Sequence, residues 1–277
     1  MTEIMMTYKP SPKPNYTKPT HIKYNSMETH MWGDSITGKV KDWIYVSNDS
    51  LHQIIFGMEA RGNFKHSDQY RTIFGADELM YVLSGVLIIT NPENGETHKV
   101  RKGESVFFKK DTWHHAFNYS DEYLHVLEFF SPPPITGTSG AYAKEKKLLK
   151  NSIYKRENYN LDKKFKAQET FKIIKNDDLV WSLDGPNQEI LIGNFINTRF
   201  LNVNIIKLLP NQKTHNFKFS KNTSYLSLNN NINVELIGKK EKFTLSEKDG
   251  LYFPAETIFN LENTTNSESS IIYCEGL

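Results

Sequence analysis

Short apolar runs alternate with polar turns along most of the chain from about residue 42 onward. The runs are four to twelve residues long and rich in β-branched and aromatic residues, as in DWIYV, HQIIFGME, LMYVLSGVLIIT, ESVFF and YLHVLEFF. This pattern is typical of β-strands. The turn NPENGETH contains Asn94-Gly95, a strong signal for a tight hairpin. Because no helical pattern of about 10 to 15 residues separates the runs, we expect antiparallel strands in a sandwich or barrel.

The strand-like runs fall into two blocks of the sequence. The first ends near residue 130 and is followed by the loop-like SPPPITGTSG and a charged, partly helical stretch, after which strand-like runs resume. The N-terminal region has four prolines and no sustained period, so we expect it to be ordered only where it packs on other residues. The two blocks suggest an internal duplication. The predicted segments are an arm (1–40), a first barrel (41–140), a connector (141–170) and a second barrel (171–277).

Composition narrows the range of partners. The chain has 34 Lys and Arg against 32 Asp and Glu, a net charge of +2, and the charges are spread along it, which argues against a nucleic-acid partner. Cys274 is the only cysteine, so an internal disulfide is excluded and a reducing compartment is indicated. No apolar run approaches the roughly 18 residues of a membrane span. We therefore expect a cytoplasmic protein that binds a small-molecule substrate, without a membrane partner.

Two groups of residues in the first block resemble the two motifs of the cupin family, small double-sheet β-barrels with metal ligands inside. In the family's first motif, Glu78 and Gly85 agree in type and spacing, but its His-x-His pair would fall among residues 71–74, which offer no usual ligand. The spacing of the second motif is matched by five residues, of which the glycine, histidine and asparagine also agree in type: Gly103, Lys109, Asp111, His114 and Asn118. The resemblance implies an all-β chain of two jelly-roll barrels with a short helical connector.

The resemblance also implies one divalent metal inside the first barrel. The nearest upstream histidine is His66, and an enlarged loop would let it stay on its strand while Glu78 begins the next. Alternate side chains of barrel strands point inward, so His66, Glu78 and His114 would form a two-histidine, one-carboxylate set. Such a set favours Fe(II), and Mn, Ni or Zn also accept it. Asp68 is a possible fourth ligand, an acceptor that orients an imidazole, or an ordinary loop acid. His115 should face the opposite way and serve packing or a rim hydrogen bond.

Three further residues are candidates for contact with the substrate. Arg71 and Tyr70 lie on the enlarged loop, where a guanidinium suits a carboxylate or phosphate; the alternative is a salt bridge that fixes the loop. Tyr81 belongs to an aromatic lining with Phe108, Trp113 and Phe130, and a tyrosine can move protons. Glu128 lies in an apolar strand and is expected to pair with an Arg or Lys, whereas His52, His98 and His125 are interpreted as structural or solvated.

The second block carries the motif spacing without the ligands. With Pro254 as the motif proline, the ligand position is filled by Phe259, while the remaining positions hold Lys248, Glu256 and Asn263. Upstream, His215 has no carboxylate partner at the expected spacing. A single histidine is a poor chelator, so we expect the second barrel to serve packing and assembly.

Three functions remain open from the sequence. The metal set and the aromatic lining favour an Fe(II) dioxygenase, a mononuclear metal oxidoreductase, that acts on a small organic acid or phenolic compound. The first alternative is an oxygen-independent isomerase, decarboxylase or lyase that uses its metal as a Lewis acid. The second is a non-catalytic small-molecule-binding cupin. Exposed sheet edges and the proline-rich arm further predict a homodimer.

Overall fold

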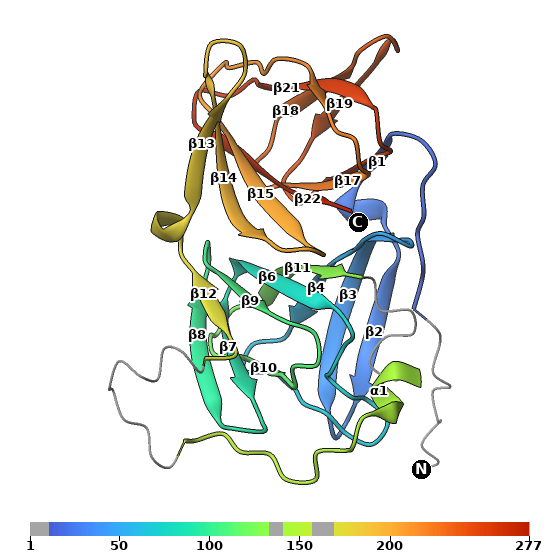
Figure 1. Cartoon of the computed structure of the whole chain (residues 1–277), viewed down its shortest axis with the longest axis vertical. Helices are drawn as coiled ribbons and strands as arrows, with labels where there is room; N and C mark the ends of the chain where they lie inside the picture. The colour runs from blue at the N-terminus through green and yellow to red at the C-terminus, as the bar shows by residue number, and fades with distance from the viewer. Residues whose placement is uncertain (1–10, 133–140, 157–168, 277) are drawn as a thin grey trace.

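The protein consists of two stacked β-barrels, as the computed structural model in Figure 1 shows. The structure describes residues 11–132, 141–156 and 169–276. Within this part of the chain the only α-helix is α1 (Ala141–Glu145), and short 3₁₀ turns cover Tyr24–Ser26 and Asn176–Asp178. The predicted all-β class with two double-sheet barrels and a short helical connector is therefore confirmed.

The first barrel pairs a seven-stranded sheet with a four-stranded sheet, both antiparallel. In spatial order, the larger sheet contains β12 (Lys172–Ile174), β9 (Ser105–Phe108), β6 (Asp77–Ser84), β11 (Leu124–Ser131), β4 (His52–Met58), β3 (Gly38–Ser47) and β2 (Thr29–Asp34). The smaller sheet contains β5 (Asn63–Phe64), β10 (His115–Asn118), β7 (Val86–Asn91) and β8 (Glu96–Arg101).

The second barrel repeats this design. Its seven-stranded sheet contains β1 (Thr20–Ile22), β20 (Gly250–Phe253), β17 (Thr223–Ser227), β22 (Ser269–Glu275), β15 (Asn202–Leu208), β14 (Ile190–Asn197) and β13 (Val180–Asp184). Its four-stranded sheet contains β16 (Phe217–Lys218), β21 (Ile258–Asn263), β18 (Ile232–Leu236) and β19 (Glu241–Leu245).

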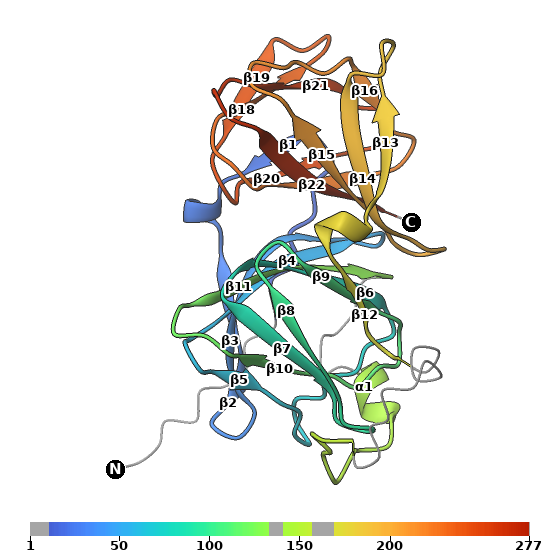
Figure 2. The same cartoon turned by 90° about the vertical axis from the view of Figure 1, so that its left-hand side faces the viewer.

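Each barrel borrows an edge strand from outside its predicted limits. β1 pairs with β20 of the second barrel, and β2 pairs with β3 of the first, although residues 1–40 were predicted to form an arm. β12, which follows the connector, pairs with β9 of the first barrel and not with the second. Figure 2 shows β1 in the second barrel and β12 at the edge of the first. Three-residue strands such as β1 and β12 are too short to show an alternation in sequence, so their pairing is decided by the free sheet edges they meet.

The two large sheets pack against each other between the barrels. Separate cores fill the barrel interiors, around Phe108 in the first and Phe259 in the second. A third core lies between the sheets and includes Leu127 and Phe129 of β11 together with Ile205 and Ile272 of the second barrel. Strands such as β11 are therefore buried on both faces, which explains why their sequences read as continuous apolar runs.

The hairpin predicted at Asn94-Gly95 joins β7 to β8. Gly95 has a φ of +73° and donates its N–H to the carbonyl of Asn91 at 2.9 Å. A side chain at this φ would be strained, and a Cβ on Gly95 would come within 2.9 Å of the carbonyl oxygen of Lys155. The turn therefore needs glycine both for its conformation and for the close passage of the connector.

The motif positions of the two barrels have matching backbone conformations. Asp111 and Glu256, which stand where the family has a glycine, have φ values of +65° and +67°. At the asparagine position, Asn118 donates its amide to the carbonyls of Met58, Glu59 and Glu122. Its counterpart in the second barrel does the same with the carbonyls of Leu208, Leu209 and Ser267. The motif spacing therefore marks equivalent turns in both barrels.

We expect Asn118→Ala to lower the free energy of unfolding by about 2 kcal/mol, because one buried and two partly buried hydrogen bonds to backbone carbonyls are lost. Asn263→Ala should cost about as much in the second barrel, since its contacts are equivalent. Urea denaturation followed by circular dichroism measures both values. A decrease in the free energy of unfolding below about 0.5 kcal/mol in either variant would show that these amides do not stabilise the turns.

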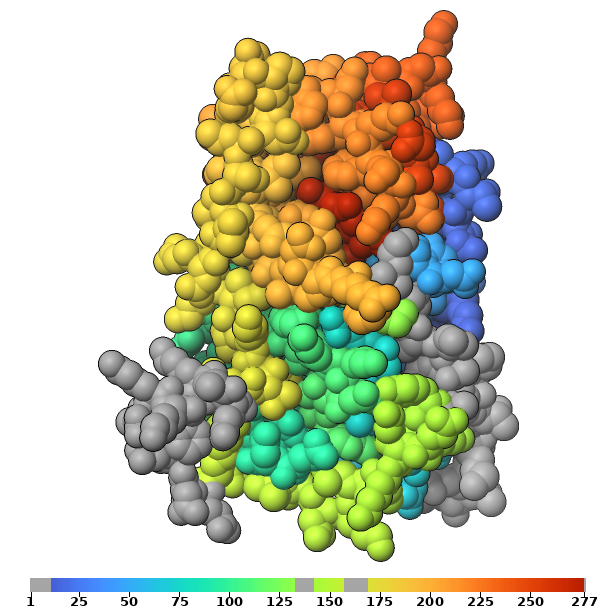
Figure 3. All heavy atoms as spheres, viewed as in Figure 1, coloured from blue at the N-terminus to red at the C-terminus, as the bar shows by residue number. Residues whose placement is uncertain are grey.

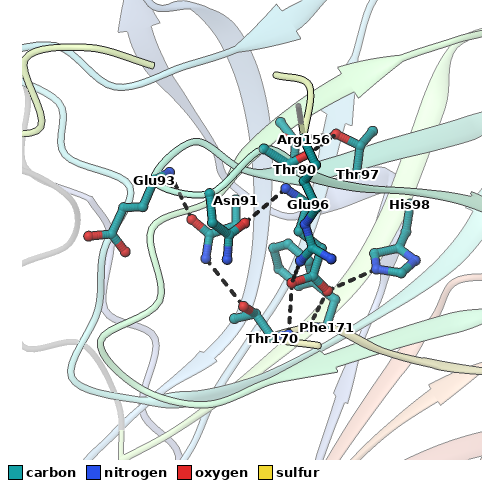
Figure 4. Close-up of polar contacts among 11 residues, drawn as sticks. Thr90, Asn91, Glu93, Glu96, Thr97, His98, Arg156, Thr170 and Phe171 are labelled. Carbon is teal, nitrogen blue, oxygen red and sulfur yellow. Dashed lines mark hydrogen bonds and ion pairs between the residues drawn. The ribbon is translucent and has the colours of Figure 1, made fainter. Parts of the chain in front are cut away.

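The connector is fastened to the first barrel on both sides of residues 157–168. The Glu96 carboxylate accepts hydrogen bonds from Arg156 Nη2 at 2.9 Å and from the backbone N–H groups of Thr170 at 2.8 Å and Phe171 at 3.0 Å. His98 Nε2 lies 2.9 Å from the same carboxylate. Figure 4 shows these donors around the buried Glu96 side chain. We call this arrangement the Glu96 clamp.

Candidate functional site

The interior of the first barrel holds a cluster of buried polar side chains. Glu78 lies two positions before Met80 on β6, and Glu128 lies between Val126 and Phe130 on β11. Since Met80, Val126 and Phe130 belong to the core of the first barrel, both glutamates face the barrel interior. Figure 1 shows β6 and β11 side by side in the middle of the large sheet, and their register is antiparallel. Both glutamates are almost completely buried, so their carboxyl groups must find partners inside the barrel.

Glu78 lies between Glu128 and His114. It hydrogen-bonds to Glu128, and its Oε2 lies 3.9 Å from His114 Nε2. Burial, together with the charge of the neighbouring carboxyl, raises the pKa of Glu78 well above its usual value, and burial raises the pKa of Glu128 to about 8. One oxygen of each glutamate, Oε2 of Glu78 and Oε1 of Glu128, has no hydrogen-bond partner among the described residues. Two carboxyl groups in such contact retain a proton between them at neutral pH.

The tautomer of His114 follows from its contacts. Its Nδ1 lies 3.2 Å from the carbonyl oxygen of Thr112, which only accepts hydrogen bonds, so Nδ1 carries the proton. Burial lowers the pKa of His114 to about 4, which leaves the ring neutral at pH 7. Nε2 therefore presents its lone pair toward Glu78. A separation of 3.9 Å is too long for a hydrogen bond, so two potential donor atoms for a cation face each other.

Aromatic rings surround this pair. The ring of Phe108 lies 4.8 Å from that of His114, and Phe74 packs at 5.7 Å from His114 and edge-on against Phe130. Phe108 is the cross-strand partner of Glu78. The predicted aromatic lining is thus present for Phe108 and Phe130, and it keeps the surroundings of Glu78 and His114 apolar.

Further polar groups lie in the same interior. Asp42 is buried, and burial together with the charge of Glu128 raises its pKa well above the usual value. His52 packs edge-on against Phe130, and burial lowers its pKa to about 4. Nδ1 of His52 and Oγ1 of Thr72 have no hydrogen-bond partner among the described residues. The sequence contained a signal for the burial of Asp42 and Glu128. Each has an apolar residue two positions before it and another two positions after it on the same strand, so all three side chains share one face.

His66 lies elsewhere, on the outer side of the small sheet. Its Nδ1 is 2.6 Å from His115 Nε2 and its Nε2 donates to the carbonyl of Leu149 at 2.7 Å, so both ring nitrogens are engaged. Its ring packs 4.8 Å from that of Trp113, and His115 Nδ1 contacts the hydroxyl of Tyr154. The predicted rim hydrogen bond of His115 is therefore present. Across residues 11–132, 141–156 and 169–276, no three His, Cys, Asp or Glu side chains converge closely enough to hold a metal in this conformation.

The other candidate residues are placed as follows. Arg71 donates from Nη1 to the carbonyls of Ala143, Lys144 and Lys146, so it binds the end of α1 in place of the predicted salt bridge. Tyr70 is buried in the barrel core, and Asp68 is exposed. The remaining candidate, Tyr81, lies in the core between the barrels and packs edge-on against Phe195. Side chains of a strand alternate between faces, so Tyr81 is turned away from the interior that Glu78 faces.

The connector covers the end of the first barrel at which Glu78 and His114 lie. Ala143 of α1 and Leu149 pack with Ile73 and Trp113 in a separate small core. Asp111 accepts a hydrogen bond from the hydroxyl of Tyr142 and forms an ion pair with Lys146 at 2.6 Å. In the space-filling view of Figure 3, residues 141–156 (lime green) run along the lower edge of the first barrel.

Comparisons with known proteins agree with the observed barrels. A family model described as a cupin domain matches residues 75–130, which include Glu78 and His114. AerE from Microcystis aeruginosa has a TM-score of 0.59 at 12% identity, with 94% of this chain and 97% of that one covered. For a mutant of Bacillus subtilis oxalate decarboxylase the TM-score is 0.61 at 10% identity, with 95% and 78% covered. For YlbA from E. coli it is 0.64 at 10% identity, with 95% and 92% covered.

No curated protein matched the sequence. Residues 75–130 form a cupin domain, and the two barrels have the fold of these solved structures. Proteins of this fold typically bind a divalent metal, although the fold alone does not select a reaction. Among the described residues, no helix has the length and apolar character that crossing a membrane requires.

Proposed function

We propose that the first barrel is the catalytic domain of a metal-dependent enzyme that acts on a small organic acid or phenolic compound. One observation carries the proposal: the lone pair of His114 Nε2 and an unpartnered oxygen of Glu78 face each other across 3.9 Å among aromatic rings inside the barrel. A buried carboxyl oxygen without a partner is costly, and a cation between these two atoms would satisfy both. The cupin domain match, which includes both residues, supports the same interpretation.

A carboxylate and an imidazole are suitable ligands for a divalent cation. In this proposal two ligands are named, and the third is to be tested. Glu78 and His114 would hold the metal, and Glu128 already contacts Glu78. His66 was the third predicted ligand, but its ring nitrogens are engaged with His115 and Leu149. A bound metal would supply Lewis-acid or redox chemistry at the carboxylate and imidazole donors.

The residues of the chain perform the remaining tasks. Thr112 holds His114 in the tautomer that exposes Nε2. Glu128 shares a proton with Glu78 and would give that proton to a substrate or take it back. Phe74, Phe108 and Phe130 exclude water around these groups. Fe(II)-dependent oxygenation fits this dry aromatic site first, and oxygen-independent isomerisation, decarboxylation or elimination is the second candidate because of the proton-sharing pair of glutamates.

Metal analysis and an oxygen electrode test the proposal. We expect purified protein, loaded anaerobically with Fe(II), Mn(II), Ni(II) or Zn(II), to retain about one metal ion per chain. Oxygen consumption with small organic acids or phenols would support the oxygenase, and turnover of the same compounds without oxygen would support the alternative. Protein that retains no metal under any of these conditions would refute metal dependence and favour a non-catalytic binding protein.

The third ligand is tested by a matched pair of variants. Glu128→Gln should lower metal retention if the carboxylate that contacts Glu78 is a ligand, whereas His66→Ala should leave it unchanged because His66 faces the connector. The reverse result would restore the set predicted from the sequence. The homodimer and the cytoplasmic location remain predictions.

A further inference from the structure

A second polar site lies between the barrels, where two equivalent turns meet. A cavity of about 100 Å³ is bordered by the turn before β9, with Lys102 and Gly103, and by the turn before β20, with Glu247 and Lys248. Gly103 and Lys248 occupy the same motif position in their barrels, with φ values of +84° and +66°. The duplication has therefore brought the same turn of each barrel to one place. A volume of this order is enough for several waters or for one small ligand.

Two lysines line this cavity, the exposed Lys102 and the partly buried Lys248. Among the described residues neither Lys102 nor Lys248 forms an ion pair within 4.0 Å of a carboxylate. Burial, with a contribution from the charge of Lys102, lowers the pKa of Lys248. Glu247 is the acidic residue that lines the cavity, and its charge acts in the opposite direction. The local excess is thus one positive charge.

Backbone contacts fix the position of Lys248. Its N–H donates to the carbonyl of Ser227 at 2.8 Å, and its carbonyl accepts the hydroxyl of Tyr45 at 2.6 Å. Its Nζ lies 5.4 Å from the centre of the Tyr24 ring. The backbone of Lys248 is thereby held at the junction, where the residue lines the cavity.

Tyr81 adds a neutral donor to the same cavity. A Cβ placed on Gly103 would lie 4.0 Å from the Tyr81 hydroxyl, so this hydroxyl faces the turn that carries Lys102. Burial raises the pKa of Tyr81 to about 12, and the hydroxyl therefore keeps its proton. Among the described contacts this hydroxyl forms no hydrogen bond within the protein, so it is available to a ligand. A donor of this kind in a cavity lined by two lysines is a typical setting for an oxyanion.

We propose that the junction of the two barrels binds a small anion with a carboxylate or phosphate group, held by Lys102, Lys248 and Tyr81. The site is separate from the interior of the first barrel, because Tyr81 and Glu78 lie on opposite faces of β6. It joins residues of both barrels, so the bound anion ties them together.

Isothermal titration calorimetry at constant ionic strength tests the anion site, with inorganic phosphate and succinate as probes. We expect saturable binding of one anion per chain. Lys102→Gln with Lys248→Gln should weaken it at least tenfold, because two charge-assisted contacts are lost, and Tyr81→Phe should weaken it about threefold. Preference for phosphate or for succinate identifies the class of ligand.

The matched control is Lys239→Gln with Lys240→Gln, which makes the same charge change on an exposed hairpin. Its affinity should equal that of the parent protein. Equal weakening by both double variants would show attraction by net charge alone and overturn the proposal, as would the absence of saturable binding by the parent. Glu78→Gln should bind phosphate normally, so failure of the metal proposal would leave this one standing.

Discussion

Glu78→Gln is expected to abolish metal retention and to lower turnover at least about 100-fold, while the protein stays folded. The amide cannot become the anionic oxygen that a metal beside His114 would need, and loss of groups that only support metal ligands already costs about 10- to 100-fold. Stability should stay within about 1 kcal/mol of the parent, since burial and the neighbouring carboxyl raise the pKa of Glu78, so that the amide replaces a protonated acid. Metal analysis, activity and urea denaturation of one preparation measure all three effects.

Glu122→Gln is the matched control for this prediction. It makes the same chemical change on an exposed side chain and should leave metal retention, turnover and stability unchanged. If Glu78→Gln retained a full complement of metal, Glu78 would not be a ligand. If it unfolded, the buried glutamate would have a structural role that its contacts with His114 and Glu128 do not reveal.

Glu96→Ala is expected to lower the free energy of unfolding at pH 7 by about 3 kcal/mol, because it leaves the partly buried Arg156 and two backbone N–H groups without their acceptor. The loss of stability should also loosen the residues that the Glu96 clamp contacts, which are Arg156, Thr170 and Phe171. Urea denaturation measures the loss, and limited proteolysis should show faster cleavage near Arg156. Glu93→Ala, an exposed acid in the same turn, should change neither measurement.

The Glu96 clamp also predicts a pH dependence. Burial raises the pKa of Glu96, but hydrogen bonds from His98, Phe171 and Thr170 outweigh burial and lower it to about 2. The unfolded chain binds this proton near pH 4.5, so the stabilisation is complete above that pH and is lost as the pH falls toward 2. Glu96→Gln should lose less stability than the parent between pH 4.5 and 2. Parallel acid unfolding curves for the two proteins would contradict the low pKa.

The candidate site was partly readable from the sequence. The spacing of the cupin motif selected His114 from two adjacent histidines, and the structure brings His114 next to Glu78. His66 was selected because it was the nearest histidine upstream, yet it binds His115 and the connector. Sequence distance could not place a residue at the far end of an enlarged loop, because the direction of its side chain depends on what the loop packs against. The connector residue that His66 contacts lies 83 positions further along the chain.

The sequence by itself determined the all-β class, the Asn94-Gly95 hairpin and the equivalent turns of the two barrels, because alternation, turn chemistry and motif spacing are local properties of the chain. Only the tertiary structure decided that β1 and β12 complete sheets outside their predicted segments, that Glu128 meets Glu78, and that Tyr81 faces the second barrel. These contacts depend on free sheet edges and on the face that each large sheet presents to its neighbour. Such relations arise only when distant strands pack together.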